Sequence, residues 1–255
     1  MTKATQPTII VIPGAWHRVS CMNLFIRSLQ AAGFPAEGIT LLGVGHADIS
    51  VADDETFIRS KIEPYIQAGK DVILIVHSYA GFPATAAISG FDSKGRRARG
   101  ESGGVLGIAY LAAFVPLEGE SVLSLLENSL LWWMKDNPES RVIETHSQAD
   151  VFYNDCSPDQ IAAVTATIEA HATKSLTTPA ASIGWRDGAY DGRRAYIRCL
   201  RDKALLLEKQ DAFIERSGVE WIVKTLDASH SPFLSIPQEL TRVVEELVNE
   251  FASTV

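Results

Sequence analysis

A serine in the sequence stands where it could act as a nucleophile. Ser78 follows the apolar run 72–76 and precedes a helical pattern, and Ala80 and Gly81 keep the far side of the turn small. A serine on such a strand-to-helix turn projects clear of its neighbours, close to the free N–H groups of a helix N-terminus. The pattern departs from G-x-S-x-G, because Val76 stands in place of the first glycine. We predict that Ser78 is the nucleophile of such an elbow rather than a serine that caps the helix.

A serine hydroxyl needs a base near neutral pH, and one of the six histidines is best placed to provide it. His230 lies in the loop 227–233, between the last predicted strand and the last predicted helix, and therefore at the same sheet edge as Ser78. His17 and His77 lie beside the proposed site, and we interpret them as neighbours that shape it. The remaining histidines do not compete as base: His46, His146 and His171.

Three aspartates are candidates for the acid that orients the imidazole. In the chain order nucleophile, acid, histidine, the acid lies between the other two and just beyond a strand. Asp202 follows the predicted strand 195–199 by a short turn, and we favour it. Asp227, on the loop of the histidine, and Asp187, near the end of a long insertion, stay open as alternatives.

Two backbone amides are expected to stabilise the oxyanion that forms when a carbonyl is attacked. Tyr79, directly after the nucleophile, supplies one N–H, and Ala15, in the turn after the first strand, supplies the other. Gly14 lets the backbone approach the substrate closely. Substrate contacts are predicted for the residues beside these groups: Gly14, Trp16, His17 and His77.

Short apolar runs alternate with helical patterns and predict the elements that must position these residues. Strands are predicted at 8–12, 39–42, 72–76, 105–114, 195–199 and 220–226, and helices at 21–32, 55–67, 79–89 and 237–251. Strands that are apolar on both faces belong to parallel sheets covered by helices on each side. The pattern predicts a doubly wound α/β fold with a mostly parallel sheet of about six strands. Ligands bind at the carboxyl ends of such strands.

A long insertion interrupts this alternation. We interpret residues 116–192 as an inserted helical lid over the strand ends, with helices near 121–135 and 158–171. Residues 1–115 and 193–255 then form one core domain, as expected for a chain of this length.

The insertion is rich in aromatic residues, which either pack within the lid or face a ligand. Trp132 and Trp133 are our candidates for substrate contact.

The stretch 90–104 combines several basic residues with glycines, and we interpret it as a mobile surface loop without a function of its own.

Composition and charge exclude several classes of function. A formal net charge of -8 would repel a phosphate backbone, so nucleic acid is not an expected partner. No run of about 18 apolar residues predicts a membrane span, and the polar start lacks the pattern of a signal peptide, so we expect a cytoplasmic protein. Cys21, Cys156 and Cys199 are too few and too widely spaced for a disulfide framework or a Cys-x-x-Cys metal site.

Four short strings together resemble the small α/β-hydrolases that include plant methylesterases, hydroxynitrile lyases and their microbial relatives. The strings are PGAWH at 13–17, HSYAG at 77–81, YIRCLRDK at 196–203 and HSPF at 230–233. The resemblance implies the α/β-hydrolase fold and needs no metal or organic cofactor. It implies a homodimer as one expectation. For the site, it implies a triad of Ser78, Asp202 and His230, with the amides of Ala15 and Tyr79 as oxyanion hole.

Two departures from the family pattern bear on the reaction. Family members usually have histidine before the glycine of the oxyanion turn, where this chain has Pro13. The lyase branch resembles a different pattern, with threonine near the oxyanion turn and lysine directly after the catalytic histidine. Here those places hold Gly14 and Ser231. These residues disfavour cyanohydrin cleavage and favour ester hydrolysis.

We therefore expect a serine hydrolase that cleaves a small or medium-sized hydrophobic ester through an acyl-enzyme. Two alternatives stay open. One is a lactonase, a hydrolase or lyase acting on carbon–carbon bonds, or a cyclase with the same triad. The other is a non-catalytic ligand-binding protein of the same fold, since function depends on the site and not on the fold.

Overall fold

A six-stranded parallel sheet forms the centre of the molecule. The computed structural model describes residues 6–254, so most of the polar start noted in the sequence lies outside the described residues. The strands are β1 (Thr8–Ile12), β2 (Ala36–Gly38), β3 (Asp71–His77), β4 (Gly104–Leu111), β8 (Arg194–Cys199) and β9 (Ile222–Leu226). They lie in the order β2-β1-β3-β4-β8-β9, and each neighbouring pair is parallel.

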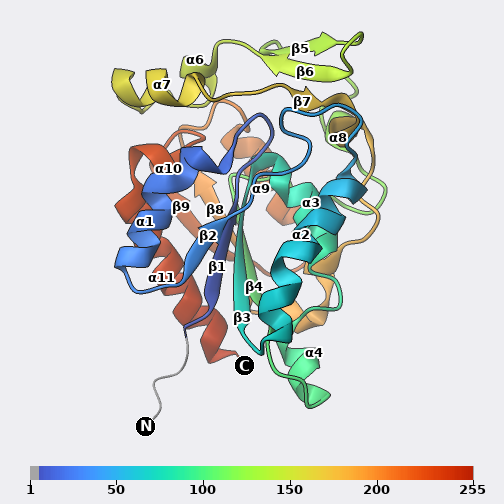
Figure 1. The fold of residues 1–255 in the computed structure, drawn as a ribbon, viewed down its shortest axis with the longest axis vertical. Helices are drawn as coiled ribbons and strands as arrows, with labels where there is room; N and C mark the ends of the chain where they lie inside the picture. The colour runs from blue at the N-terminus through green and yellow to red at the C-terminus, as the bar shows by residue number, and fades with distance from the viewer. Residues whose placement is uncertain (1–5, 255) are drawn as a thin grey trace.

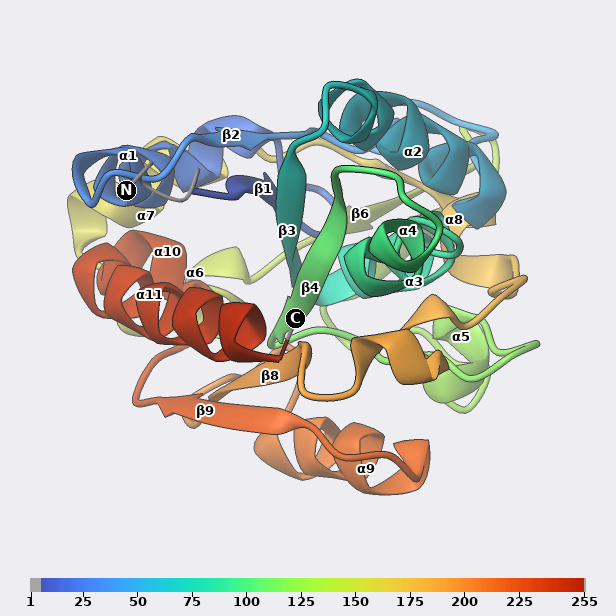
Figure 2. The same cartoon turned by 90° about the horizontal axis from the view of Figure 1, so that it is seen from below.

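Helices cover both faces of this sheet, as Figure 1 and Figure 2 show. On one face α1 (Asn23–Ala31) packs against α11 (Pro237–Ser253), and on the other α2 (Val51–Gln67) packs against α3 (Gly81–Ala87). The predicted doubly wound α/β fold is confirmed. Because the connections after β1 and β3 cross opposite faces, the strand order reverses between these two strands, and ligands bind at such a reversal.

Burial on both faces explains why the central strands form. Every residue of β1 and β4 is buried, and β3 is buried from Val72 to its end. On one face the ring of Phe251 in α11 lies so close to β4 that a Cβ on Gly107 would meet it at 2.3 Å. Helix α11 therefore packs directly on the backbone of the sheet. Among residues 6–254 we find no helix with the length and apolar character that a membrane span requires.

Four core elements differ from their predicted positions or were not predicted. Helix α2 begins earlier than residue 55, because Ser50 and Asp53 form a capping box at its start. The strand expected at 39–42 is instead β2, three residues closer to the N-terminus. The stretch 90–104, expected as a loop, contains α4 (Ser93–Ala98). A further helix that we did not predict, α9 (Leu207–Ser217), joins β8 to β9.

Residues between β4 and β8 build a second layer above the strand ends (Figure 1). Its elements are α5 (Val122–Leu125), β5 (Met134–Asn137), β6 (Val142–Thr145), α6 (Gln148–Val151), α7 (Pro158–Thr165), β7 (His171–Ala172) and α8 (Thr173–Thr177). Strands β5, β6 and β7 form a small antiparallel sheet. Two short 3-10 helices, Gly184–Arg186 and Gly188–Tyr190, lead the chain back to the core.

The small sheet corrects the prediction of two helices in this layer. The helix expected over 121–135 is wrong beyond α5, because Glu127 and Asn128 adopt left-handed backbone conformations that end it. The chain then enters β5, which pairs with β6 as a hairpin. The second helix ends at Thr165. The pairing of β6 with β7 joins residues about 30 positions apart, and the helical periodicity of the segment reveals neither this pairing nor the hairpin.

Truncation of Phe251 to alanine should remove the contact between α11 and the sheet. A buried phenylalanine replaced by alanine leaves a cavity and costs about 3–5 kcal/mol of unfolding free energy. Ser253→Ala, on the exposed side of the same helix, should change the unfolding free energy by less than about 0.5 kcal/mol. Equilibrium denaturation in urea measures both values. Similar stabilities for the two variants would contradict the packing described here.

Candidate active site

The proposed nucleophile sits on a strained turn at the end of β3. Ser78 has a φ of 54°, in the left-handed region that residues with a side chain rarely adopt. The chain continues as a 3-10 helix, Ser78–Ala80, and then as α3. Gly81 is required here, because a Cβ on it would lie 2.1 Å from the carbonyl oxygen of Phe114. The turn therefore has the strained strand-to-helix geometry of a nucleophile elbow.

The turn after β1 lies against this elbow. Because Ile12 pairs with Val76, Gly14 lies against Ser78, and a Cβ on Gly14 would come within 2.7 Å of Ser78 Cβ. Ala15 and Tyr79, the predicted oxyanion donors, both line the cavity that contains Ser78. The structure thus brings these predicted residues together.

The proposed base and acid form a buried pair. His230 Nδ1 lies 2.7 Å from Asp202 Oδ2, and both side chains are buried. The backbone N–H groups of Ala204 and Leu205 each donate to Asp202 Oδ1 at 2.8 Å. Gln210 Nε2 donates to Asp202 Oδ2 at 3.4 Å. With Nδ1 donating to the carboxylate, the other ring nitrogen, Nε2, is left as the proton acceptor.

The two alternative acids lie elsewhere. The side chain of Asp227 is 75% exposed and pairs with Arg201. Asp187 caps the 3-10 helix Gly188–Tyr190 by accepting the N–H of Ala189. Of the three candidates, Asp202 is the one that contacts the histidine.

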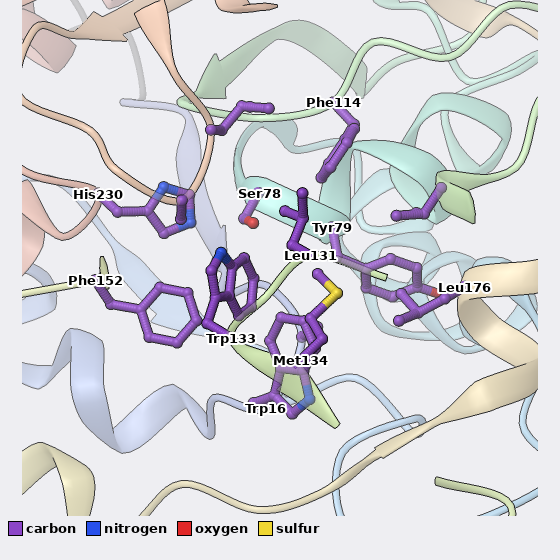
Figure 3. A pocket seen from close by; sticks show the side chains of 14 residues that line it. Trp16, Ser78, Tyr79, Phe114, Leu131, Trp133, Met134, Phe152, Leu176 and His230 are labelled. Atoms are coloured by element: carbon purple, nitrogen blue, oxygen red, sulfur yellow. The ribbon is translucent and has the colours of Figure 1, made fainter. Parts of the chain in front are cut away.

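A cavity contains the proposed nucleophile, Ser78. Figure 3 shows the side chains of Ser78, His230 and Trp133 directed into it. Its lining residues are Ala15, Trp16, Ser78, Tyr79, Phe114, Val122, Leu131, Trp133, Met134, Phe152, Leu176, Ala204, Leu205 and His230. In the part of the chain that the structure describes, the lining includes no carboxylate, ammonium or guanidinium group. The cavity is therefore suited to an uncharged, largely apolar ligand.

The candidate substrate contacts separate into two groups. Trp16 and Trp133 line the cavity and pack edge to face, with ring centroids 5.5 Å apart. Trp132 is 65% exposed and lies against His146 outside the cavity, so its predicted substrate contact is not supported. The two residues lie in the turn that precedes β5, and the sequence did not indicate which of them faces the cavity.

His17 and His77 are buried behind the cavity wall. His77 Nε2 donates to the carbonyl oxygen of His230 at 2.8 Å. Burial lowers the pKa of His17 to about 4, and burial together with the neighbouring His230 lowers that of His77 well below its ordinary value. Both imidazoles are neutral near pH 7. They support the loops of the site and do not line the cavity.

A buried carboxyl that the sequence did not single out lies behind Tyr79. Asp54 Oδ2 accepts the hydroxyl of Tyr79 at 3.0 Å, and Oδ1 accepts the N–H of Gly43 at 3.2 Å. Burial raises the pKa of Asp54 to about 6. In the sequence Asp54 reads as an ordinary acidic residue in the first turn of α2. Its role as a support for the Tyr79 ring depends on the tertiary contact.

Several cavity residues escaped the sequence analysis because they come from loops and from the second layer. They are Phe114, Val122, Leu131, Met134, Leu176, Ala204 and Leu205. No motif marks them, since an apolar side chain in a loop has no periodicity that tells where it faces. Among residues 6–254 we find no group of three or more His, Cys, Asp or Glu side chains arranged to hold a metal ion.

The chain is similar in sequence to a known protein family and to named proteins. Residues 9–243 match the model of the family described as "Alpha/beta hydrolase family". The chain is 30% identical to "Probable hydrolase R7" of Phoma sp., over 95% of this chain and 98% of that protein. It is 26% identical to "Methylesterase 7" of Arabidopsis thaliana, over 99% and 100% of the two chains.

Solved structures show the same fold. The crystal structure of a pyrethroid hydrolase from Sphingobium faniae is similar with a TM-score of 0.75 and 20% identity, over 98% of this chain and 100% of that one. Polyneuridine aldehyde esterase is similar with a TM-score of 0.74 and 18% identity, over 95% and 99% of the chains.

Replacement of Gly14 by alanine should disturb the nucleophile. The added Cβ would overlap Ser78, and a displacement near 1 Å in such a site costs about 100-fold in rate. We expect a fluorophosphonate probe to label Ser78 about 100-fold more slowly in Gly14→Ala than in the wild type. Gly188→Ala is the matched control, because a Cβ there has 3.6 Å to its nearest neighbour. Equal labelling rates in both variants would argue against the close approach.

Asp54→Asn should change how stability depends on pH. The pKa of Asp54 rises from 3.8 to about 6 on folding, so its stabilising contribution is fully present below about pH 4 and is lost as the pH rises through 6. The unfolding free energy of Asp54→Asn, relative to wild type, should therefore increase by about 2–3 kcal/mol between pH 4 and pH 8.

The neighbouring residue provides a control of opposite sign. Hydrogen bonds from Ser50 lower the pKa of Asp53, so its contribution is present at high pH and is lost as the pH falls. Relative to wild type, Asp53→Asn should therefore become less stable as the pH rises. Denaturation from below pH 4 up to pH 8 measures both variants, because the contribution of Asp53 changes below its ordinary pKa of 3.8 and that of Asp54 changes up to about pH 6. A flat difference for Asp54→Asn would refute the raised pKa of its buried carboxyl.

Proposed function

Since this chain belongs to the alpha/beta hydrolase family, we propose that it is a serine hydrolase that cleaves small, uncharged, hydrophobic esters. The observation that carries the proposal is the presence of Ser78, on a strained elbow, and His230, paired with Asp202, at one apolar cavity. The relatives named hydrolase and methylesterase support the same class of reaction.

The reaction proceeds through an acyl-enzyme. Ser78 Oγ attacks the ester carbonyl while its proton passes to His230 Nε2, and Asp202 stabilises the resulting imidazolium. The N–H groups of Ala15 and Tyr79 donate to the oxyanion of the tetrahedral intermediate. His230 then returns the proton to the departing alcohol. Water, activated by the same imidazole, attacks the acyl-enzyme and releases the acid and free Ser78.

The cavity limits the charge of the substrate, because its lining carries no ionic partner for a charged group. A charged acyl group would lose its hydration in this cavity without gaining an ionic partner, which costs several kcal/mol. Neutral aryl or alkyl esters therefore fit better than half-esters of dicarboxylic acids.

Residues 116–192 act in this proposal as a lid, and residues 1–115 and 193–255 as the core that carries the triad. Leu131, Trp133, Met134 and Phe152 come from the second layer and line the cavity opposite the core. Their removal from the strand ends would open the nucleophile to solvent. The lid thus supplies the apolar wall that selects the substrate.

A panel of neutral p-nitrophenyl and methyl aryl esters tests the proposal. The wild type should turn over at least one of them, and Ser78→Ala and His230→Ala should each lower kcat by about 1,000-fold or more, because residues of a triad act as a unit. Ser60→Ala and His146→Ala replace the same residue types away from the cavity and should keep wild-type rates. A folded wild type that neither hydrolyses the panel nor reacts with a fluorophosphonate would refute the proposal and favour a ligand-binding protein.

A further inference from the structure

We infer that Tyr153, in the lid, is a positioning residue that acts through His17 on the oxyanion turn at Ala15. This inference rests on the proposed hydrolase function. It assigns a role to a buried tyrosine hydroxyl and to an imidazole that neither line the cavity nor contact the triad by a hydrogen bond.

Two hydrogen bonds connect the three residues. His17 Nδ1 lies 2.7 Å from the carbonyl oxygen of Ala15, and His17 Nε2 lies 2.5 Å from the hydroxyl oxygen of Tyr153. A carbonyl oxygen only accepts, so Nδ1 carries the hydrogen. In the neutral ring, Nε2 then has a free lone pair and accepts the tyrosine O–H. Donor and acceptor roles are thereby assigned along the whole connection.

Burial keeps this arrangement in one protonation state. Both His17 and Tyr153 are buried, and burial lowers the pKa of the imidazole to about 4. The ring is therefore neutral over the pH range in which a serine hydrolase works. Removal of the hydroxyl alone would leave Nε2 without a partner in a buried place, which is unfavourable.

The connection ends on the residue that must be oriented. Ala15 follows the close approach at Gly14 and precedes Trp16, whose φ of 66° lies in the left-handed region. A bond to the carbonyl of Ala15 restrains the peptide on one side of this residue, while its N–H is the proposed oxyanion donor on the other. Oxyanion stabilisation depends on donors that are already in place before the reaction. The hydrogen bonds from Tyr153 to His17 and from His17 to Ala15 supply that restraint.

Residues next to Tyr153 reach the other loops of the site. Ser229, beside the proposed base, donates its hydroxyl to Phe152 O at 3.2 Å and its N–H to Asp155 Oδ2 at 2.9 Å. Asn154 Nδ2 donates to the carbonyl oxygen of Arg201, directly before the proposed acid, at 3.1 Å. The segment 152–155 therefore contacts the oxyanion turn, the histidine loop and the acid loop. The hydroxyl of Tyr153 is its contact with the first of these.

Tyr153→Phe tests the role of the hydroxyl while keeping the ring. With a neutral ester that the wild type hydrolyses, kcat per active site should fall about 10- to 100-fold, and KM should change less than about threefold. Titration with a fluorophosphonate counts active sites, so loss of folded protein does not enter kcat. Tyr190→Phe is the matched control, because its buried hydroxyl donates to the carbonyl oxygen of Ile88 outside the cavity. It should keep the wild-type kcat.

Variants of His17 separate positioning from packing. His17→Asn keeps an N–H that can reach the carbonyl of Ala15, and it should retain more activity than His17→Ala. In the His17→Asn background, Tyr153→Phe should have little further effect, since no Nε2 remains to accept the hydroxyl.

Each outcome decides between the two proposals. An active wild type with unchanged kcat in Tyr153→Phe, or with fully additive losses in the double variant, would overturn the positioning role and leave the hydrolase function intact. A wild type without turnover and without labelling at Ser78 would overturn the hydrolase function, and the positioning role would fail with it.

Discussion

Everything in the site depends on the close approach of two turns at the carboxyl ends of β1 and β3. Parallel pairing of Ile12 with Val76 brings Gly14 so near Ser78 that no side chain fits between them. The strands that impose this pairing are buried on both faces, so the hydrophobic core determines the distance. A nucleophile with a left-handed φ is strained, and a rigid surrounding structure is needed to hold it.

The second layer above the strand ends completes the cavity at the edge of the sheet. The core carries the proposed nucleophile, base and acid. The second layer adds part of the apolar cavity wall: Val122, Leu131, Trp133, Met134, Phe152 and Leu176. The layer is also tied to the oxyanion turn, because Trp16 Nε1 donates to the carbonyl oxygen of Ile143 at 2.8 Å and the N–H of Glu169 donates to the carbonyl of Trp16. Cavity shape and backbone orientation are therefore coupled through the same contacts.

The histidines of this region differ in burial effects and in hydrogen-bond partners. Desolvation favours the neutral imidazole and lowers the pKa of His17, His77 and His171. His230 differs from these three in its hydrogen-bond partner, because its Nδ1 lies 2.7 Å from Asp202 Oδ2.

The sequence by itself determined the alternation of the core strands with most of their covering helices, the elbow at Ser78 and the loops that carry His230 and Asp202, because these features depend on local periodicity and turn chemistry. The choice of Asp202 over Asp227 and Asp187 required the contact with the histidine. Only the tertiary structure decided the small antiparallel sheet, the outward side of Trp132, and the partners of Asp54 and Tyr153. Most of these features depend on contacts between residues distant in the chain, such as the pairing of β6 with β7 and the hydrogen bond of Tyr153 with His17, and a single sequence carries no local pattern for such contacts.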